Sequence, residues 1–443
     1  MLKTFPIGGI HPSDSKISKD CRIEAIPLPE TVTIPLSQHI GAPAQAIVAK
    51  GDRVRTGQLI AKSNGFVSSN IHSSVTGVVT AVDTFLDQAG LRKPGITIKV
   101  EPDEWMDGID TSSQIIRECS LSPQEIIAKV AEAGIVGMGG ATFPTHVKLS
   151  VPEGKHAEFL IINGVECEPY LTDDYRVMIE RGEEFLIGVK ILAKALGVGK
   201  VIVGIENNKP DAIEQLTKLA GIISPDTEIV PLKVQYPQGS EKHLIAAVTG
   251  RQVPSGGLPI DVGAIVQNVG TALAVYDAVQ KNKPLIERVV TITGHVERQA
   301  NLLVRVGTSM SDLLKHCGGL PEDAGKVISG GPMMGRAISN IDAPIVKGTS
   351  AILVMHQNQS VRPQATSCVR CAKCVNACPM GIEPYLLSKL AKKSLWEEAE
   401  AHHITDCVEC GSCSWQCPSA LPLLDFIRIG KTEVMKIIRA RKS

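Results

Sequence analysis

Residues 368–378 read CVRCAKCVNAC and residues 407–417 read CVECGSCSWQC, and a proline follows each stretch. Both stretches have the spacing C-x2-C-x2-C-x3-C-P, and together they hold eight of the twelve cysteines in the chain. A [4Fe–4S] cluster needs four converging thiolates, and in two-cluster proteins the fourth cysteine of each stretch binds the other cluster. The spacing therefore predicts two [4Fe–4S] clusters. The expected ligands are Cys368, Cys371, Cys374 and Cys417 for one cluster, and Cys407, Cys410, Cys413 and Cys378 for the other.

A pair of zinc ribbons is the alternative, because these also use C-x2-C pairs. Zinc takes four ligands per site, however, and gives no reason for a third closely spaced cysteine or for the proline after the fourth. Between the two stretches, apolar residues recur at helical spacing, which predicts two helices joined near Lys393–Ser394. We therefore expect an α-helical two-cluster ferredoxin module.

The composition excludes several other classes of protein. The 46 basic residues balance 46 acidic residues, and aromatic residues make up 3% of the chain. A nucleic-acid partner is therefore not expected, because such proteins present a basic surface or aromatic stacking platforms. The first residues lack the pattern of a signal peptide. No apolar run approaches the ~20 residues that span a bilayer, so we expect no transmembrane segment in this chain.

A glycine-rich loop is expected in the stretch EIIAKVAEAGIVGMGGATFPTHVKL, which covers residues 125–149. The helix that precedes the loop should end at Gly134. Gly137, Gly139 and Gly140 allow backbone N–H groups to approach a ligand, since no Cβ stands in the way. Lys148 then supplies a cation suited to a phosphate or to a reduced flavin. The loop matches neither the dinucleotide fingerprint nor the P-loop, so by itself it indicates only a turn able to hold a ligand.

A buried strand at residues 159–162 runs into Asn163 and a loop that holds Glu166 and Glu168. From residue 183 to 234, helical and strand patterns alternate, which predicts a parallel sheet covered by helices. Ligands of such sheets bind at the carboxyl ends of the strands. The loop after residue 162 should therefore belong to a binding site.

Two smaller domains are expected on either side of this sheet. Short β-rich runs at residues 40–82, separated by glycine-containing turns, predict a small barrel or sandwich that resembles the biotinyl/lipoyl carrier fold but lacks a modifiable lysine at its tip. Residues 284–347 read as strand, strand, helix and strand, and resemble a soluble-ligand-binding β-grasp domain. Its SGGPMMG segment, residues 329–335, either cradles a ligand or contacts the cluster module.

Several of these stretches together resemble known families. The stretches GMGGATFPTHVKL and INGVECEPYLTDD, with YPQGSEKHL at 236–244 and IVQNVGTALAVYDAV at 265–279, are similar in order to loops of the flavin- and NADH-binding subunit of respiratory complex I. Over essentially residues 1–430 the chain resembles the C subunits of Rnf-type ion-translocating ferredoxin:NAD oxidoreductases.

The resemblance implies a multidomain α/β protein with four domains and a tail. The expected ranges are 1–105 for a barrel-sandwich hybrid, 120–280 for a Rossmann-like domain that binds FMN and NADH, 284–347 for the β-grasp domain, 360–430 for the two-cluster ferredoxin module, and 431–443 for a basic tail.

The resemblance also implies the residues of a flavin and nicotinamide site. Non-covalent FMN is expected to contact Gly137, Gly139, Gly140, Lys148 and Asn163, with Glu166 and Asn268 near its ring or ribityl chain. Glu168 and Glu241 are expected to be the catalytic acidic pair beside NAD(H), the substrate. The chain departs from the complex I pattern at Met138, Val165 and Ser240, where arginine, aspartate and glutamate are usual.

The implied function is exchange of hydride between NAD(H) and FMN, with single electrons passing through two [4Fe–4S] clusters. The implied partners are the other subunits of a membrane-embedded electron-transport complex, including a ferredoxin-type iron–sulfur subunit. The implied location is the cytoplasmic face of the cell membrane, as a peripheral subunit. Two alternatives remain at this point: a soluble relative, such as a cobalamin reductase or an amino-acid-reductase electron-transfer protein, and a non-catalytic iron–sulfur relay.

Overall fold

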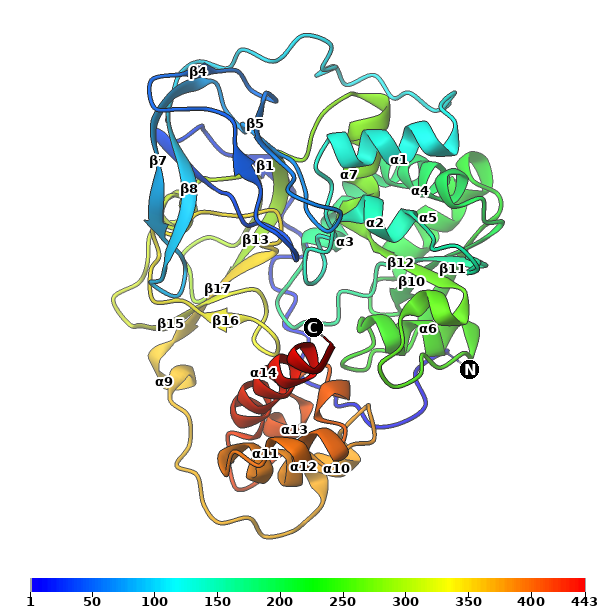
Figure 1. The fold of residues 1–443 in the computed structure, drawn as a ribbon, viewed down its shortest axis with the longest axis vertical. Helices are drawn as coiled ribbons and strands as arrows, with labels where there is room; N and C mark the ends of the chain where they lie inside the picture. The colour runs from blue at the N-terminus through cyan, green and yellow to red at the C-terminus, as the bar shows by residue number, and fades with distance from the viewer. Residues whose placement is uncertain (1, 443) are drawn as a thin grey trace.

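The computed structural model describes residues 2–442, with the side chains of residues 2–441. It contains a four-stranded parallel sheet with helices, a small two-sheet barrel, a six-stranded mixed sheet and a helical module at the C-terminal end (Figure 1). The expected multidomain α/β fold is thus confirmed. No helix in the described part of the chain combines the length and the apolar character needed to cross a membrane.

The parallel sheet has the strand order β11-β10-β9-β12. Its strands are β9 (Phe159–Asn163), β10 (Lys200–Glu206), β11 (Thr227–Leu232) and β12 (Ala264–Asn268). Because side chains alternate along a strand, the sheet buries two apolar faces. One face packs against α1 (Pro123–Glu132), α3 (Asp173–Glu180), α4 (Gly182–Leu196), α5 (Pro210–Ile223) and α7 (Val269–Gln280), and the other against α6 (Glu241–Thr249). We call this unit the flavin domain, after the ligand that the sequence predicts for it.

Local sequence accounts for the ends of these helices. Helix α1 begins with a capping box between Ser122 and Glu125, which satisfies two backbone donors that would otherwise lack partners. Helix α4 ends at Gly197, whose φ of 65° lies in the left-handed region that glycine adopts at little cost. The short helix α2 (Thr145–Leu149) and the 3-10 turn η1 (Pro259–Val262) complete the domain.

The barrel has two small sheets around one apolar core. One sheet contains β2 (Thr31–Pro35), β8 (Arg92–Val100), β7 (Gly77–Leu86) and β4 (Arg53–Val54), and the other contains β3 (Gln45–Ala46), β5 (Leu59–Lys62) and β6 (Ile71–His72). Their inward-facing side chains, among them Val32, Ile34, Ile60 and Ile98, are fully buried.

The mixed sheet of the β-grasp domain extends beyond the expected residues 284–347. Its order is β1 (Ile23–Ala25), β14 (Ala300–Arg305), β13 (Glu287–Gly294), β17 (Ala351–His356), β15 (Ala324–Ser329) and β16 (Arg336–Ala337), with helix α8 (Met310–His316) packed on it. Strand β1 comes from the N-terminal region and pairs in parallel with β14. A strand of three residues is too short to show a periodic pattern, so the sequence did not reveal it.

The cluster module is built from short helices around the cysteine loops. They are α10 (Lys373–Asn376), α11 (Pro384–Lys392), α12 (Trp396–Ala401), the 3-10 turn η2 (Ile404–Asp406), α13 (Ser412–Trp415) and α14 (Leu423–Lys442). Residues 431–442, expected as a tail, continue α14, and Val434 is buried in the module. Ser443 lies outside the described residues.

An exposed linker, residues 361–372, connects the one-turn helix α9 (Gln357–Ser360) to this module. Figure 1 shows the linker as a long loop at the bottom of the molecule.

Lys347 joins three of the units. Its buried Nζ donates hydrogen bonds to the carbonyl of Asn70 in the barrel, at 2.9 Å, and to that of Gly134 in the flavin domain, at 2.7 Å. Its own backbone N–H donates to Gln38 of the barrel. Burial lowers the pKa of Lys347 to about 7. The ammonium is held by carbonyl dipoles, which fixes the barrel close to the start of the glycine-rich loop.

The contact between α4 and α7 predicts a stability difference between two helical glycines. A Cβ on Gly188 in α4 would lie 2.0 Å from the Ala272 carbonyl oxygen, whereas a Cβ on Gly221 in α5 would meet nothing within 4 Å. Gly188→Ala should therefore destabilise the flavin domain by about 1–3 kcal/mol through overpacking. Gly221→Ala, the matched control, should stabilise it by about 0.5–1 kcal/mol because alanine favours the helix. Thermal unfolding of both variants checks the prediction, and equal shifts would contradict it.

Candidate functional site

The predicted flavin residues gather at the carboxyl ends of two neighbouring strands. Asn163 and Asn268 are paired in register at the ends of β9 and β12. Asn163 donates a hydrogen bond to the Gly239 carbonyl at 2.8 Å. Asn268 caps α7 by accepting from the Thr271 N–H and donates to Asp174 at 2.6 Å. The two asparagines thereby tie the strand ends to the loops around them.

The glycine-rich loop lies against the end of β12. Gly137 N–H donates to the Phe143 carbonyl and closes the loop. A Cβ on Gly139 would stand 2.5 Å from Asn268 Nδ2, so only glycine permits this close approach. At Gly140 a Cβ would meet nothing within 4 Å, so the loop has a free face there.

Lys148 and Glu241 form an ion pair beside the strand ends. Lys148 Nζ lies 2.7 Å from Glu241 Oε1 and donates to the Val266 carbonyl at 3.1 Å. Glu241 is the first residue of α6. Both side chains are about one third exposed (29% and 38%), so the pair is screened by water and Lys148 remains accessible to an anionic ligand.

Two buried polar atoms near the strand ends have no hydrogen-bond partner in the described structure. They are Gln267 Nε2, next to Asn268 in β12, and Thr145 Oγ1, in the helix that carries Lys148. Both atoms are closed to solvent, so it is the free face at Gly140 and the accessible Lys148 that offer contacts to a ligand. The donors and the cation present here suit a phosphate-bearing flavin.

Acidic side chains lie beneath the loop. Glu166, at a φ of 48°, accepts hydrogen bonds from the N–H groups of Asp174 and Tyr175 at the start of α3. Burial, reinforced by the charge of Glu166, raises the pKa of Asp174 to about 7. The neighbouring Asp173 is buried against Arg288, 2.9 Å away. Burial raises the pKa of both aspartates, so each contributes less negative charge near the site than an exposed carboxylate would.

Glu168 holds a loop of the β-grasp domain. Its carboxylate accepts hydrogen bonds from the N–H groups of Met333, at 3.1 Å, and Met334, at 2.6 Å. A Cβ on Gly331 would lie 2.2 Å from Glu168 Oε2, which explains the glycine there. Met333 packs in a small apolar cluster with Cys410. Of the two alternatives for residues 329–335, the structure favours the contact with the cluster module.

The eight motif cysteines form two groups. Cys378, Cys407, Cys410 and Cys413, here called the inner set, are mostly buried, and Cys368, Cys371, Cys374 and Cys417, the outer set, are more exposed. Burial raises the pKa of Cys413 to about 12, and the nearby thiols of Cys407, Cys410 and Cys378 add to this rise. In the outer set, burial raises the pKa of Cys374, and Cys417 adds to it. The structure therefore brings the fourth cysteine of each stretch to the opposite group.

Both cysteine loops have one backbone shape. Positive φ angles occur at Arg370 and Ala372 in the first loop and at Glu409 and Gly411 in the second, at equivalent positions. Such left-handed residues turn successive groups inward and form concave sites.

The inner set lies against the flavin domain. The buried Tyr236 donates its hydroxyl hydrogen bond to the Cys410 carbonyl at 2.8 Å. His243 Nε2 donates a hydrogen bond to the Pro379 carbonyl, and the Gly9 N–H donates one to the Ala377 carbonyl. A Cβ on Gly8 would meet the Cys378 carbonyl at 2.5 Å, so the N-terminal segment also packs closely on this set. Sequence reasoning assigned no role to Tyr236, Gly8 or Gly9, although YPQG and GGIHP were visible motifs.

A nucleotide-type site at the strand ends, joined to two cysteine clusters, defines a flavin and iron–sulfur electron-transfer protein. Residues 130–277 match the family described as the Nuo51 FMN-binding domain, and residues 360–418 match the 4Fe-4S dicluster domain. Residues 3–104 match the RnfC barrel sandwich hybrid domain, and residues 289–337 match the SLBB domain.

Relatives identify the particular family. The chain is 50% identical to the C subunit of the proton-translocating ferredoxin:NAD(+) oxidoreductase complex of Clostridium ljungdahlii, over 98% of this chain and 94% of that protein. It is 42% identical to the Na(+)-translocating counterpart of Acetobacterium woodii, over 97% of this chain and 96% of that protein. The C subunit of the ion-translocating oxidoreductase complex of Rhodobacter capsulatus is 46% identical, over 87% of this chain and 75% of that protein. The chain belongs to this family, the C subunits of ion-translocating ferredoxin:NAD oxidoreductase complexes.

Solved structures share the fold at lower similarity. A chain of an NAD+-reducing [NiFe]-hydrogenase in the air-oxidized state superimposes with a TM-score of 0.51 and 18% identity, over 71% of this chain and 66% of that one. The H2-reduced state gives a TM-score of 0.50, over 70% of this chain and 61% of that one.

Asp174 predicts a pH dependence of stability. Its folded pKa of about 7 lies above the ordinary value of 3.8, so between these pH values the unfolded chain ionises first and wild-type stability falls as the pH rises. An asparagine at this position would not titrate, so Asp174→Asn should be more stable than wild type above about pH 7, by roughly 1–3 kcal/mol. The gain should disappear below about pH 4.

Denaturant titrations across this pH range measure the difference. Asp226→Asn, which removes an exposed carboxylate before β11, is the control. A gain for Asp174→Asn that is the same at every pH would contradict the prediction.

Proposed function

We propose that this protein exchanges hydride with NAD(H) at a non-covalently bound FMN and exchanges single electrons with a partner through two [4Fe–4S] clusters. The FMN would be held by Gly137, Gly139, Gly140, Lys148 and Asn163, with Glu166 and Asn268 beside it. Bound FMN accepts a hydride and releases electrons singly, which matches a two-electron carrier to one-electron clusters. The observation that carries the proposal is the Tyr236–Cys410 contact, because it joins the flavin domain directly to the inner set.

Lys148 is the proposed phosphate ligand. Its present partner, Glu241, is accessible to water, so the existing ion pair is weak. A phosphate could therefore replace Glu241 as the partner of the Lys148 ammonium at little cost in free energy. The free face at Gly140 would then lie toward the ligand. Glu241, released from Lys148, would be free to accept hydrogen bonds from the nicotinamide nucleotide.

The role of Glu168 beside NAD(H) stays a prediction. Its carboxylate is already hydrogen-bonded to the N–H groups of Met333 and Met334. Burial raises its pKa, and these two amides oppose the rise. Glu168 therefore also positions the loop that contacts Cys410.

The two cysteine sets differ in what they face. The inner set is buried beside Tyr236, and two ligands of the outer set, Cys368 and Cys371, are exposed on the linker. The linker also presents Val369, 67% exposed, and the cation Arg370, and the exposed Lys373 follows at the start of α10. We propose that the outer set meets the electron-transfer partner, an acidic ferredoxin-type iron–sulfur subunit. The whole protein would lie at the cytoplasmic face of the cell membrane, bound through other subunits.

Composition and activity of the intact chain test the main proposal. Protein prepared without oxygen should contain about eight irons and show a flavin spectrum. It should also reduce an artificial acceptor with NADH. Lys148→Ala should retain less FMN, whereas Lys155→Ala, which removes an exposed lysine paired with Asp261, should retain it fully. Zinc in place of iron, or cluster-loaded protein with neither flavin nor NADH activity, would refute the proposal.

The order in which electrons pass through the two cysteine sets is tested by substituting one cysteine of each set. Cys371→Ser should lose about four irons yet keep NADH-dependent reduction of the remaining cluster, seen by electron paramagnetic resonance. Electron transfer to the ferredoxin-type partner should then fall by about tenfold or more. In Cys410→Ser, NADH should still reduce an artificial acceptor that takes electrons directly from the flavin. NADH should no longer reduce the outer cluster. Undiminished reduction of the outer cluster in Cys410→Ser would contradict the proposed order.

A further inference from the structure

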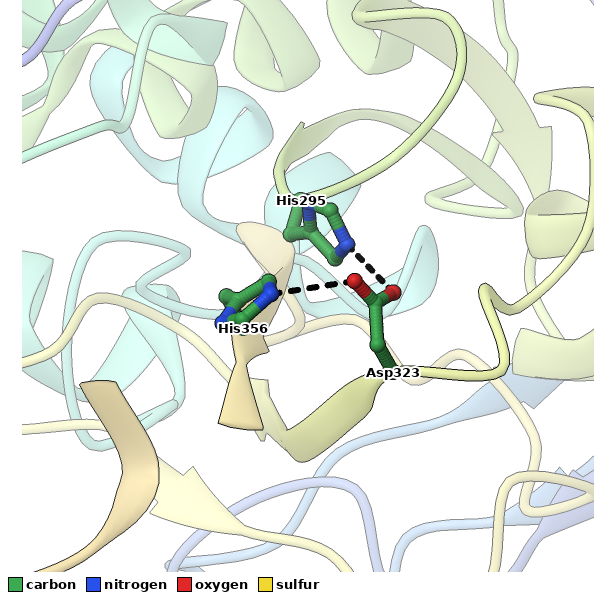
Figure 2. A group of neighbouring side chains, drawn as sticks. All are labelled: His295, Asp323 and His356. Carbon is green, nitrogen blue, oxygen red and sulfur yellow. Dashed lines mark hydrogen bonds and ion pairs between the residues drawn. The ribbon is translucent and has the colours of Figure 1, made fainter. Parts of the chain in front are cut away.

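Three side chains meet at one end of three neighbouring inner strands of the β-grasp sheet, outside the cysteine loops. Figure 2 shows His295, Asp323 and His356 pointing toward one another. Strand β17 lies between β13 and β15. Gly294 of β13 pairs with Val354, and Ala324 of β15 pairs with His356. His295, which follows β13, and Asp323, which precedes β15, therefore flank the end of β17.

The donor atoms of the three residues are close together. His295 Nε2 lies 2.6 Å from Asp323 Oδ1, and His356 Nε2 lies 3.0 Å from Asp323 Oδ2. All three donor atoms fall within 4.8 Å of one another. The hydrogen bond from His295 lowers the pKa of Asp323, so the carboxylate is charged at neutral pH. Each side chain is one third to one half exposed, which leaves room for water on the open side.

We propose that His295, Asp323 and His356 bind one divalent cation of the zinc class, with water completing the coordination. Imidazole nitrogen and carboxylate oxygen are ligands that Zn2+ and its transition-metal neighbours prefer. Zinc binds such atoms at about 2.0–2.2 Å, so donors about 3 Å apart need little movement to share it. His356 ends β17, and backbone hydrogen bonds hold the other two residues beside it, from the His295 N–H to the Val354 carbonyl and from the Gln357 N–H to the Asp323 carbonyl.

The tautomer of His356 shows what binding changes. His356 Nδ1 accepts a hydrogen bond from the Asn358 N–H at 3.1 Å, so the neutral ring carries its proton on Nε2, toward Asp323. Coordination at Nε2 requires this proton to move to Nδ1, and the bond from Asn358 is then lost. That bond caps α9, the single turn before the exposed linker. Cation binding is therefore coupled to the start of the linker that carries Cys368 and Cys371.

The competing interpretation is a hydrogen-bonded ion pair alone, because two imidazoles that donate to one carboxylate are complete without a metal. Zinc binding to the anaerobically prepared, cluster-loaded chain distinguishes the two. After equilibrium dialysis against micromolar free Zn2+, zinc and iron per chain are measured by plasma mass spectrometry. The expected result is one zinc per chain with an unchanged iron content. Unchanged iron shows that zinc has not replaced the clusters.

Single substitutions assign the bound zinc. His295→Gln, Asp323→Asn and His356→Gln should each weaken zinc binding by at least about tenfold. His156→Gln, which removes an exposed histidine of the flavin domain, should leave zinc binding unchanged. The absence of stoichiometric zinc in wild type, or equal zinc in all four variants, would overturn the proposal. Because the three side chains are one third to one half exposed, their substitution should not disturb folding, and the unchanged iron content checks this.

Discussion

Four largely buried sulfurs set the main constraint on this molecule. Burial raises the pKa of Cys407 and Cys413 to about 12, so without a bound cation these thiols would remain neutral at physiological pH. Iron supplies the positive charge that makes thiolates stable in such surroundings. Because the inner set draws Cys378 from one stretch and three cysteines from the other, filling it ties the two halves of the module together.

The inner set also fixes the module to the rest of the chain. Tyr236 of the flavin domain binds the Cys410 carbonyl, and Glu168 binds the β-grasp loop that packs on the same cysteine. The N-terminal segment fills the remaining side, with Ile10 paired to Tyr236. Three segments distant in sequence thus meet at one cysteine loop. Movement of any of them would alter the surroundings of the inner sulfurs, and hydrogen bonding and burial are what tune the potential of such clusters.

The barrel has a structural role in this arrangement. Lys347 anchors it to Gly134, where the glycine-rich loop begins, and the Ile40 N–H reaches the Thr142 carbonyl within that loop. The loop is therefore supported by the sheet on one side and by the barrel on another. Support from two directions keeps a segment of small residues in one conformation, which a binding loop requires.

From the sequence alone came the class of each domain and the prediction of two cysteine sets. Repeated spacing is local information, and the exchange of the fourth cysteine is predicted from the pattern that two-cluster ferredoxins share. The helix end near Gly134 and the strand that ends at Asn163 were equally local. The tertiary structure decided what each local pattern contacts: β1 in a distant sheet, Glu168 on the loop at Met333, Tyr236 on Cys410, and His356 beside His295 and Asp323. These contacts depend on strand register and domain packing between residues far apart in the chain, and no periodicity in one segment encodes them.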